Sequence, residues 1–87
     1  MYWRIQKDHL VDGSIITKSR VGYGVGNEVP HNEPLYRVRL FDDDGELYYE
    51  GVSDDDGLEH MFNWASRDAG VTLLQILMNG VWRDEIG

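Results

Sequence analysis

Carboxylates are the side chains of this sequence whose number and spacing could do chemistry. Between Leu40 and Ser66 the chain has nine Asp and Glu residues and no Lys or Arg. The whole chain has 16 acidic and 8 basic residues and a formal net charge of −8, so the excess of negative charge is local. Carboxylates at this density could form a catalytic acid–base pair, hold a cation, or face a basic partner.

Cation binding is the first of these alternatives, because Asp-Asp-Asp-Gly occurs twice in this stretch. An EF-hand loop needs an acid at position 1, Gly at position 6 and Glu at position 12. The two frames have Leu40 and Val52 at position 1, and Gly51 and Asn63 at position 12, so neither fits. The histidines also lack the spacing of a metal site: they are His9, His31 and His60. We therefore predict no metal site and no cofactor, with a weakly divalent-cation-responsive domain as an alternative.

Enzymatic chemistry is not favoured by the pattern. No serine has the Gly-x-Ser-x-Gly frame of a hydrolase nucleophile. Paired catalytic carboxylates need a cleft that raises the pKa of one of them, and these acids fall on predicted turns of a small domain. The glycine-rich segment 22–26 does not match the Gly-x-Gly-x-x-Gly pattern of a dinucleotide-binding loop, because Asn27 stands where the third glycine of the pattern would be. The prolines that follow the segment also argue against the helix that such a loop needs. We predict that the protein is not an enzyme.

A binding surface is the remaining interpretation. Side chains on one face of a strand repeat every ~6.6 Å, which is comparable to the phosphate spacing along a nucleic-acid strand. We predict a non-enzymatic acidic protein that occupies a basic, nucleic-acid-binding surface of a partner protein, as an inhibitor or nucleic-acid mimic would. Aromatic side chains dominate interface hot spots, so two are included. The predicted partner-binding residues are Asp42, Asp43, Asp44, Glu46, Asp54, Asp55, Asp56, Tyr48 and Trp64.

A structural or oligomer-forming domain is the alternative from another class. In that interpretation a second layer or a partner copy covers the aromatic side chains of Phe41, Tyr48 and Trp64. This alternative allows a homodimer. Salt would weaken such a dimer little, unlike an electrostatic contact.

A central hairpin must position the first group of acids. Segments 35–41 and 47–52 alternate in polarity, and Asp44-Gly45 between them predicts a type I′ turn. Tyr48 and Phe41 then face away from the core, and Asp42 lies near solvent. With that turn the predicted cross-strand pairs are Leu40–Tyr49, Phe41–Tyr48, Arg39–Glu50 and Asp42–Leu47. The predicted core face consists of Tyr36, Val38, Leu40, Leu47 and Tyr49.

A helix over about 57–68 must position the second group. Its apolar side chains recur at i, i+3, i+4 and i+7, and they are Leu58, Met61, Phe62 and Ala65. Asp55 or Asp56 is the predicted N-cap, and Asp56 with Glu59 approximates a capping box. Gly70 suits the left-handed position after the helix.

The flanking segments predict more strands. Trp3 and Ile5 alternate with polar residues as in a strand, Asp12-Gly13 is a turn signal, and 14–18 predicts a second strand. Segment 20–34 is rich in Gly, Asn and Pro and predicts a flexible loop. Segment 71–78 with the Asn79-Gly80 turn predicts a second hairpin, although a short helix over 71–78 is an alternative.

Length and composition bound the architecture. Eighty-seven residues predict a single domain over 1–87, of the α+β class: a small antiparallel sheet of hairpins packed on one amphipathic helix. The chain has no Cys, no signal-peptide pattern at its start and no apolar run long enough to span a membrane, so we expect a cytoplasmic protein without a membrane partner. The acidic balance disfavours direct nucleic-acid binding.

Four short motifs carry a resemblance to known sequences. They are Trp-x-Ile-x-Lys-Asp-His at 3–9, Asp-Asp-Asp-Gly-Glu-Leu-Tyr-Tyr-Glu-Gly at 42–51, Trp-Ala-x-x-Asp-Ala-Gly at 64–70 and Asn-Gly-x-Trp at 79–82. With these motifs the chain resembles a group of small, uncharacterised acidic bacterial proteins. The resemblance implies a small α+β domain and brings no activity or site. In size and acidity, and not in motif, the chain also resembles phage-encoded inhibitors of host defence, such as anti-CRISPR and anti-restriction proteins.

Overall fold

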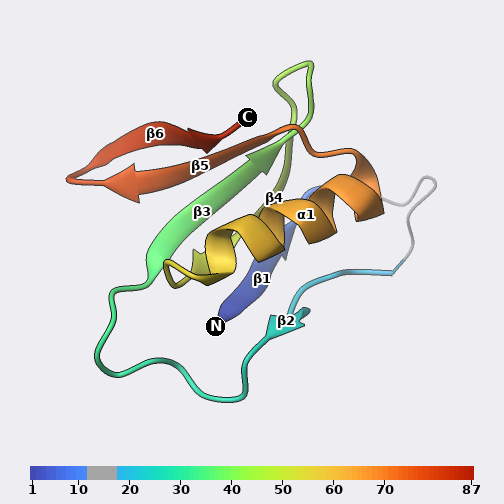
Figure 1. The fold of residues 1–87 in the computed structure, drawn as a ribbon. Coiled ribbons are helices and arrows are strands. Elements are labelled where there is room, and N and C mark those ends of the chain that lie inside the picture. The colour runs from blue at the N-terminus through green and yellow to red at the C-terminus, as the bar shows by residue number, and fades with distance from the viewer. Residues whose placement is uncertain (12–17) are drawn as a thin grey trace.

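The protein folds as one six-stranded antiparallel sheet with a single helix packed on it, as a computed structural model of residues 1–11 and 18–87 shows (Figure 1). The strand order is β2-β1-β4-β3-β5-β6. The elements are β1 (Trp3–Asp8), β2 (Gly24–Val25), β3 (Tyr36–Phe41), β4 (Leu47–Ser53), α1 (Gly57–Ala69), β5 (Leu73–Met78) and β6 (Val81–Ile86). The predicted α+β class is confirmed, and the predicted helix over 57–68 is observed within one residue.

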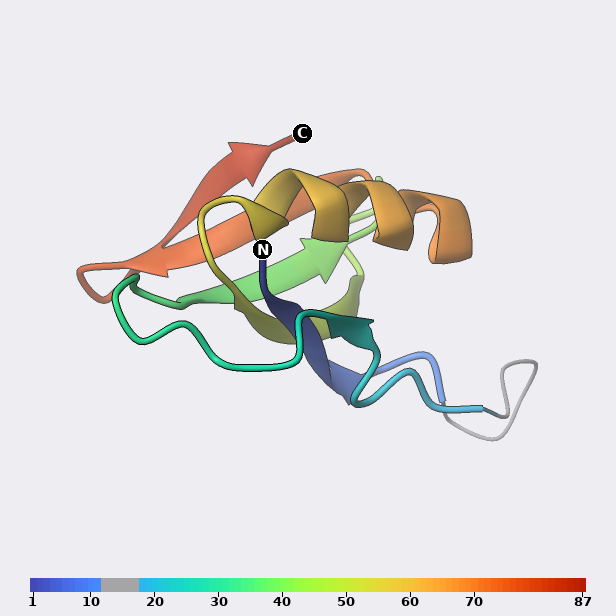
Figure 2. The same ribbon diagram turned by 60° about the horizontal axis from the view of Figure 1, so that its bottom comes forward.

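The core lies between α1 and one face of the sheet (Figure 2). Strand alternation sends Val38 and Leu40 of β3 into this core and Arg37 and Arg39 to the other face. The buried apolar side chains are Trp3, Ile5, Val38, Leu40, Tyr49, Leu58, Met61, Ala65, Val71, Leu74 and Ile76. No helix among the described residues covers the second face of the sheet.

The helix forms where the apolar stripe predicted it. Leu58, Met61 and Ala65 are buried against the sheet, and Phe62 lies at the margin of the core. The helix ends at Gly70, whose φ of 77° is the predicted left-handed conformation. No helix in the described part of the chain is long and apolar enough to cross a bilayer.

The β3–β4 hairpin has the predicted strands, but its turn differs from the prediction. Gly45 is left-handed with a φ of 79°, whereas Asp44 is not. The N–H of Asp42 donates to the carbonyl of Glu46, and the N–H of Gly45 donates to the carbonyl of Asp42. These bonds define a three-residue loop in which a type I turn is followed by a left-handed glycine, in place of the predicted type I′ turn.

The extra loop residue changes the register next to the turn. Leu40 pairs with Tyr49 as predicted, but Phe41 pairs with Leu47 and not with Tyr48, because the strands shift by one residue at a bulge. The predicted pair of Asp42 with Leu47 is therefore also wrong. Because of the shift, Tyr48 does not lie opposite Phe41 on the outer face, where the sequence predicted it.

The second hairpin and its turn are confirmed, although β5 begins at Leu73 and not at Val71. β5 and β6 pair around Asn79 and Gly80, whose φ values of 52° and 78° are both left-handed as a type I′ turn requires. The strand alternative for 71–78 is correct, and the helix alternative is wrong.

The N-terminal part of the chain builds one edge of the sheet. β1 forms as predicted and pairs with β4, with a bulge between Ile5 and Lys7. The predicted Asp12-Gly13 turn and most of the strand predicted over 14–18 lie outside the described residues. Within the segment predicted as a loop over 20–34, Gly24 and Val25 form β2, which pairs with the start of β1.

Candidate functional site

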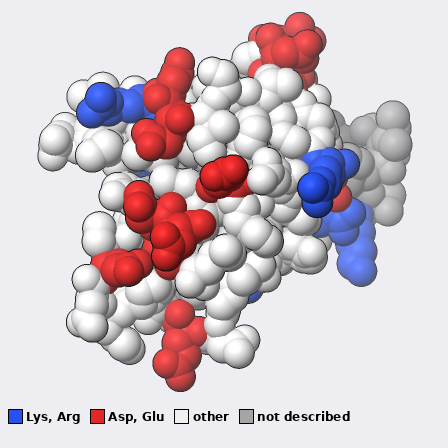
Figure 3. All heavy atoms as spheres, in the orientation of Figure 1, with Lys and Arg blue, Asp and Glu red and all other residues white. Residues whose placement is uncertain are grey.

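The predicted site residues lie at two opposite ends of β4 and on α1. The exposed acids of the β3–β4 turn form one group, the hairpin cluster: Asp43, Asp44 and Glu46. The exposed acids at the start of α1 form the other, the helix-start cluster: Asp55, Asp56 and Glu59. The seven residues of β4 separate the two clusters by ~20 Å at ~3.3 Å per residue. Acidic side chains accordingly form separate groups on the helix side of the surface (Figure 3).

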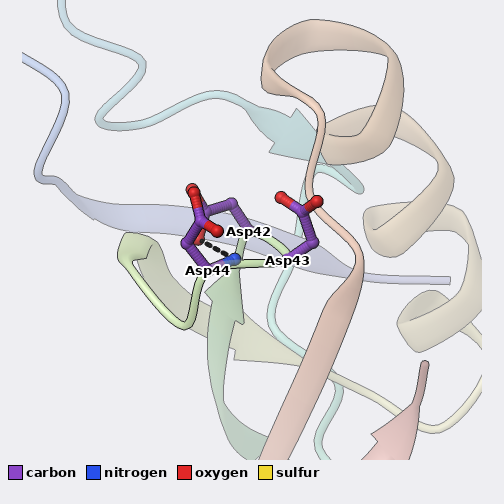
Figure 4. Close-up of side chains that lie close together, drawn as sticks. All are labelled: Asp42, Asp43 and Asp44. Atoms are coloured by element: carbon purple, nitrogen blue, oxygen red, sulfur yellow. Dashed lines mark hydrogen bonds between the residues drawn. The ribbon is translucent and has the colours of Figure 1, made fainter.

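Asp42 is part of the turn and not of the exposed surface, contrary to the prediction. Its side chain is only 9% exposed. Its Oδ1 accepts a hydrogen bond from the backbone N–H of Asp44 at 3.0 Å (Figure 4). The same atom accepts a second bond from the backbone N–H of Glu46 at 2.7 Å. A short Asp side chain suits this arrangement, because it can satisfy N–H groups two to four residues ahead in a turn. Asp42 therefore holds the backbone that presents the hairpin cluster.

Asp54 has the same role at the start of α1. It is 2% exposed, and its Oδ1 accepts a hydrogen bond from the N–H of Gly57 at 2.8 Å. Its other carboxylate oxygen lies 3.8 Å from the amino group of Met1. Asp56, one of the two predicted caps, has helical backbone angles and no side-chain capping bond. Asp56 is therefore the N-cap residue by position, as predicted, but its side chain makes no capping bond, and Asp54 supplies the carboxylate that accepts from the start of the helix.

Two buried carboxylates therefore each support a turn that carries exposed carboxylates. This arrangement divides the predicted acidic residues by role. Asp42 and Asp54 are occupied by backbone N–H groups and are not available to a partner. Asp43, Asp44, Glu46, Asp55 and Asp56 remain exposed on turns whose backbone is fixed.

Tyr48 is half-buried against the margin of the core, which corrects its predicted place on the outer face. The bulge next to the turn is the physical reason, because it shifts Tyr48 out of the pairing with Phe41. Hydrogen bonding to the Asp42 carboxylate and burial raise the pKa of Tyr48, and the nearby charges of Glu46 and Asp44 act in the same direction. Tyr48 is a weak candidate for a partner anchor in this environment.

Trp64 belongs to an aromatic group formed within the chain. Its ring stacks on Tyr23 with centroids 4.8 Å apart and also contacts Trp3 and Tyr49, each at 5.4 Å. Trp3 continues the group by donating its Nε1–H to Nδ1 of His60 at 3.1 Å. The segment that was predicted as a loop supplies Tyr23, so Trp64 is covered by its own chain on that side.

One polar network was missed by sequence reasoning. The Tyr49 hydroxyl donates to Asp68 at 2.6 Å, and the guanidinium of Arg20 lies 3.2 Å from the same carboxylate. Burial raises the pKa of Tyr49, and so does the hydrogen bond to Asp68. The three residues come from β4, α1 and the segment before β2, so no local spacing in the sequence indicates their contact.

Glu50 and Arg39 do not form an ion pair, although their predicted cross-strand position is confirmed. The Glu50 carboxylate lies 2.7 Å from Nε2 of His9, and the Arg39 guanidinium lies over the ring of Trp82. The cation–π contact leaves Arg39 available on the second face of the sheet.

The positions of the carboxylates give little support to the alternative of a divalent-cation site. Carboxylate oxygens of Asp42, Asp43 and Asp44 lie within 4.8 Å of one another (Figure 4). The Oδ1 atom of Asp42 already accepts two hydrogen bonds, so it offers an ion less than a free carboxylate would. The closeness of these three carboxylates follows from the turn, which the side chain of Asp42 stabilises.

No protein-family model, curated protein or solved structure matches this chain. The interpretation of its function therefore depends on the geometry and charge described above.

Proposed function

We propose that this protein is a non-enzymatic binding protein whose hairpin and helix-start clusters engage a basic surface on a partner protein. The observation that supports the proposal is the repeated arrangement of a buried carboxylate beneath an exposed acidic turn. Asp42 fixes the first turn, and Asp54 fixes the second. Carboxylates held on a rigid backbone lose less conformational entropy on binding than carboxylates on a mobile loop.

The spacing of the clusters limits the kind of partner. A separation of ~20 Å is far larger than the shell of a single ion and suits an extended basic groove. Electrostatic complementarity of this kind mainly raises the association rate and selects among partners. A groove that binds nucleic acid has the required density of Lys and Arg. In its narrower form, we propose that the protein is an inhibitor that mimics nucleic acid, such as an anti-CRISPR protein.

The experiment neutralises one exposed cluster and leaves its buried support intact. A variant with Asp43→Asn, Asp44→Asn and Glu46→Gln, and a second with Asp55→Asn, Asp56→Asn and Glu59→Gln, are compared with the wild type. Proteins captured from the native host are purified, and their affinities are measured at low and high salt. We expect each variant to bind at least about tenfold more weakly than the wild type at low salt.

The matched control removes the same number of negative charges elsewhere on the surface, with Glu28→Gln, Glu33→Gln and Glu85→Gln. An equal loss in this control would show that only net charge matters and would contradict the proposal, as would full binding by both cluster variants. Competition by a nucleic-acid duplex for the captured partner tests the narrower form. A partner that binds the duplex and this protein together contradicts the mimicry.

A further inference from the structure

Basic side chains gather on the face of the sheet that α1 does not cover. Arg37 and Arg39 lie on this face because their neighbours in β3 point into the core. Arg4 alternates in the same way with the buried Trp3 and Ile5 of β1. After the bulge in β1, Lys7 pairs with Glu50, which also lies on this face. Four of the eight basic residues of the chain therefore share one surface, the basic sheet face: Arg4, Lys7, Arg37 and Arg39.

These four side chains outnumber the carboxylates of Glu50 and Asp84 on the same face, and none of the four forms an ion pair within the described residues. Within residues 1–11 and 18–87, no carboxylate oxygen lies within 4 Å of them. Arg4 donates instead to the backbone carbonyl of Gly26. The two carboxylates on this face have other partners, since Glu50 contacts His9 and Asp84 accepts a hydrogen bond from Gln75.

An indole ring lies among these cations. Trp82 of β6 pairs with Leu77 and is half-buried on the same face. The guanidinium carbon of Arg39 lies 3.8 Å from the centre of its ring, and that of Arg37 lies at 5.8 Å. A shallow hollow opens beside this group, lined by Gln6, Lys7, Arg37, Val38, Glu50, Gly51 and Trp82.

We propose that the basic sheet face binds single-stranded nucleic acid. An uncovered sheet face that carries an indole and planar guanidinium groups offers stacking surfaces for unpaired bases. The four cations offer phosphate contacts, and residues such as Arg37 and Arg39 repeat at ~6.6 Å along the strand, close to the spacing of successive phosphates. The acidic clusters use other residues, so this inference is independent of the proposed function.

A second copy of the chain or an acidic peptide would fit the basic sheet face less well than single-stranded nucleic acid. A second copy packed face to face would place like charges opposite each other. An acidic peptide would meet the cations but would not use the stacked indole. The net charge of −8 argued against nucleic acid when the sequence was taken as a whole. Because charge acts mainly within a Debye length of ~10 Å, the local excess of cations on this face counts more for a bound strand than the total.

The experiment measures the fluorescence anisotropy of labelled single-stranded DNA and RNA 12-mers titrated with the protein at about 20 mM and about 200 mM salt. We expect saturable binding at low salt, with log K falling against log salt with a slope of at most about 3, because at most four phosphates are contacted. Trp82→Leu should weaken binding at least about fivefold through lost stacking. The double variant Arg37→Gln, Arg39→Gln should weaken it further and lower the salt slope.

The matched control is the double variant Arg67→Gln, Arg83→Gln, which removes two positive charges outside the basic sheet face and should bind as the wild type does. If the double variant Arg37→Gln, Arg39→Gln fails to fold, the single substitution Lys7→Gln at an exposed position tests the same face. Circular dichroism checks that each variant is folded. No binding by the wild type at low salt overturns the proposal. Equal weakening by the control, or equal affinity for a labelled duplex measured in the same way, overturns it as well. None of these outcomes depends on binding by the acidic clusters.

Discussion

Asp42 and Asp54 show that carboxylates of the same chemistry have different roles in one chain. Each is nearly buried and accepts backbone hydrogen bonds, while its acidic neighbours face solvent. A buried carboxylate without such partners would be strongly destabilising. The hydrogen bonds to these two side chains therefore offset the cost of burying them, and variants of the exposed acids should leave these bonds intact.

Substitution of Asp54 tests its role as the helix cap. Asp54→Ala should lower the free energy of unfolding by about 1–2 kcal/mol, because the N–H of Gly57 loses its acceptor at the start of α1. Asp55→Ala should cost less than about 1 kcal/mol, since this exposed carboxylate interacts only with the helix dipole. Urea denaturation of both variants provides the measurement. Equal losses would show that Asp54 is not the cap.

The hydroxyl of Tyr49 makes stability depend on alkaline pH. Burial and the hydrogen bond to Asp68 raise the pKa of Tyr49 above the usual value of about 10, so the folded protein keeps this proton to higher pH than the unfolded chain does. The stabilisation is fully present below about pH 10 and is lost as the pH rises from there towards the folded-state pKa.

Tyr49→Phe removes that ionisation and allows a direct comparison. At pH 8 the variant should lose about 1 kcal/mol because the bond to Asp68 is absent. Between pH 8 and about pH 11 it should lose less stability than the wild type does. Urea unfolding at the two pH values measures both effects, and identical pH dependence in the two proteins would contradict this account.

At the scale of the elements, Gly51 controls how closely three of them pack. It lies in β4 between β1 and β3, opposite Ile5 on one side and Val38 on the other. A Cβ atom at this position would lie 2.2 Å from the carbonyl oxygen of Arg4 and 2.9 Å from Cε of Met61 on α1. The first of these contacts is with backbone, so a rotamer change cannot relieve it.

Gly51→Ala should therefore destabilise the protein by about 2 kcal/mol or more. Gly45→Ala is the comparison, because a Cβ there meets nothing within 4 Å and costs only the strain of a left-handed φ, about 1 kcal/mol. Thermal unfolding of the two variants orders the losses. A smaller loss for Gly51→Ala than for Gly45→Ala would show that β1 and β4 can separate without cost.

At the scale of the whole molecule, charge is sorted by surface. Six exposed acids lie at the two ends of β4, in the hairpin and helix-start clusters, and half of the basic side chains lie on the uncovered face of the sheet. The two acidic clusters and the basic sheet face are thus different surfaces of the molecule. A net charge of −8 also implies self-repulsion that salt should reduce.

Neutralising the hairpin cluster should relieve this repulsion. Asp43→Asn with Asp44→Asn should raise the melting temperature by about 2–4 °C at low ionic strength, and the gain should shrink at high salt. Asp55→Asn with Asp56→Asn removes the same charge from a helix N-terminus and should give a smaller gain or a loss. Melting curves at low and high salt separate the cases, and equal gains at both salt concentrations would contradict an electrostatic origin.

The residues that follow one another along the chain were enough to predict the β3–β4 and β5–β6 hairpins, the helix and the α+β class. Asn79-Gly80 produced the expected turn, and the apolar stripe of α1 placed the helix within one residue. These features depend on contacts between near neighbours, which a sequence pattern records directly. The same locality explains the error at Asp44-Gly45, where the side chain of Asp42 favours a longer loop over the type I′ turn.

The function of each charged or aromatic residue depended on contacts between distant parts of the chain. The burial of Asp54, the stacking of Trp64 on Tyr23 and the contact of Tyr49 with Asp68 all join different elements. Composition showed an acidic protein, because net charge is a sum over residues. Which of those charges are exposed, and that four cations share one face, follows only from how the strands pair and from the side of the sheet that α1 covers.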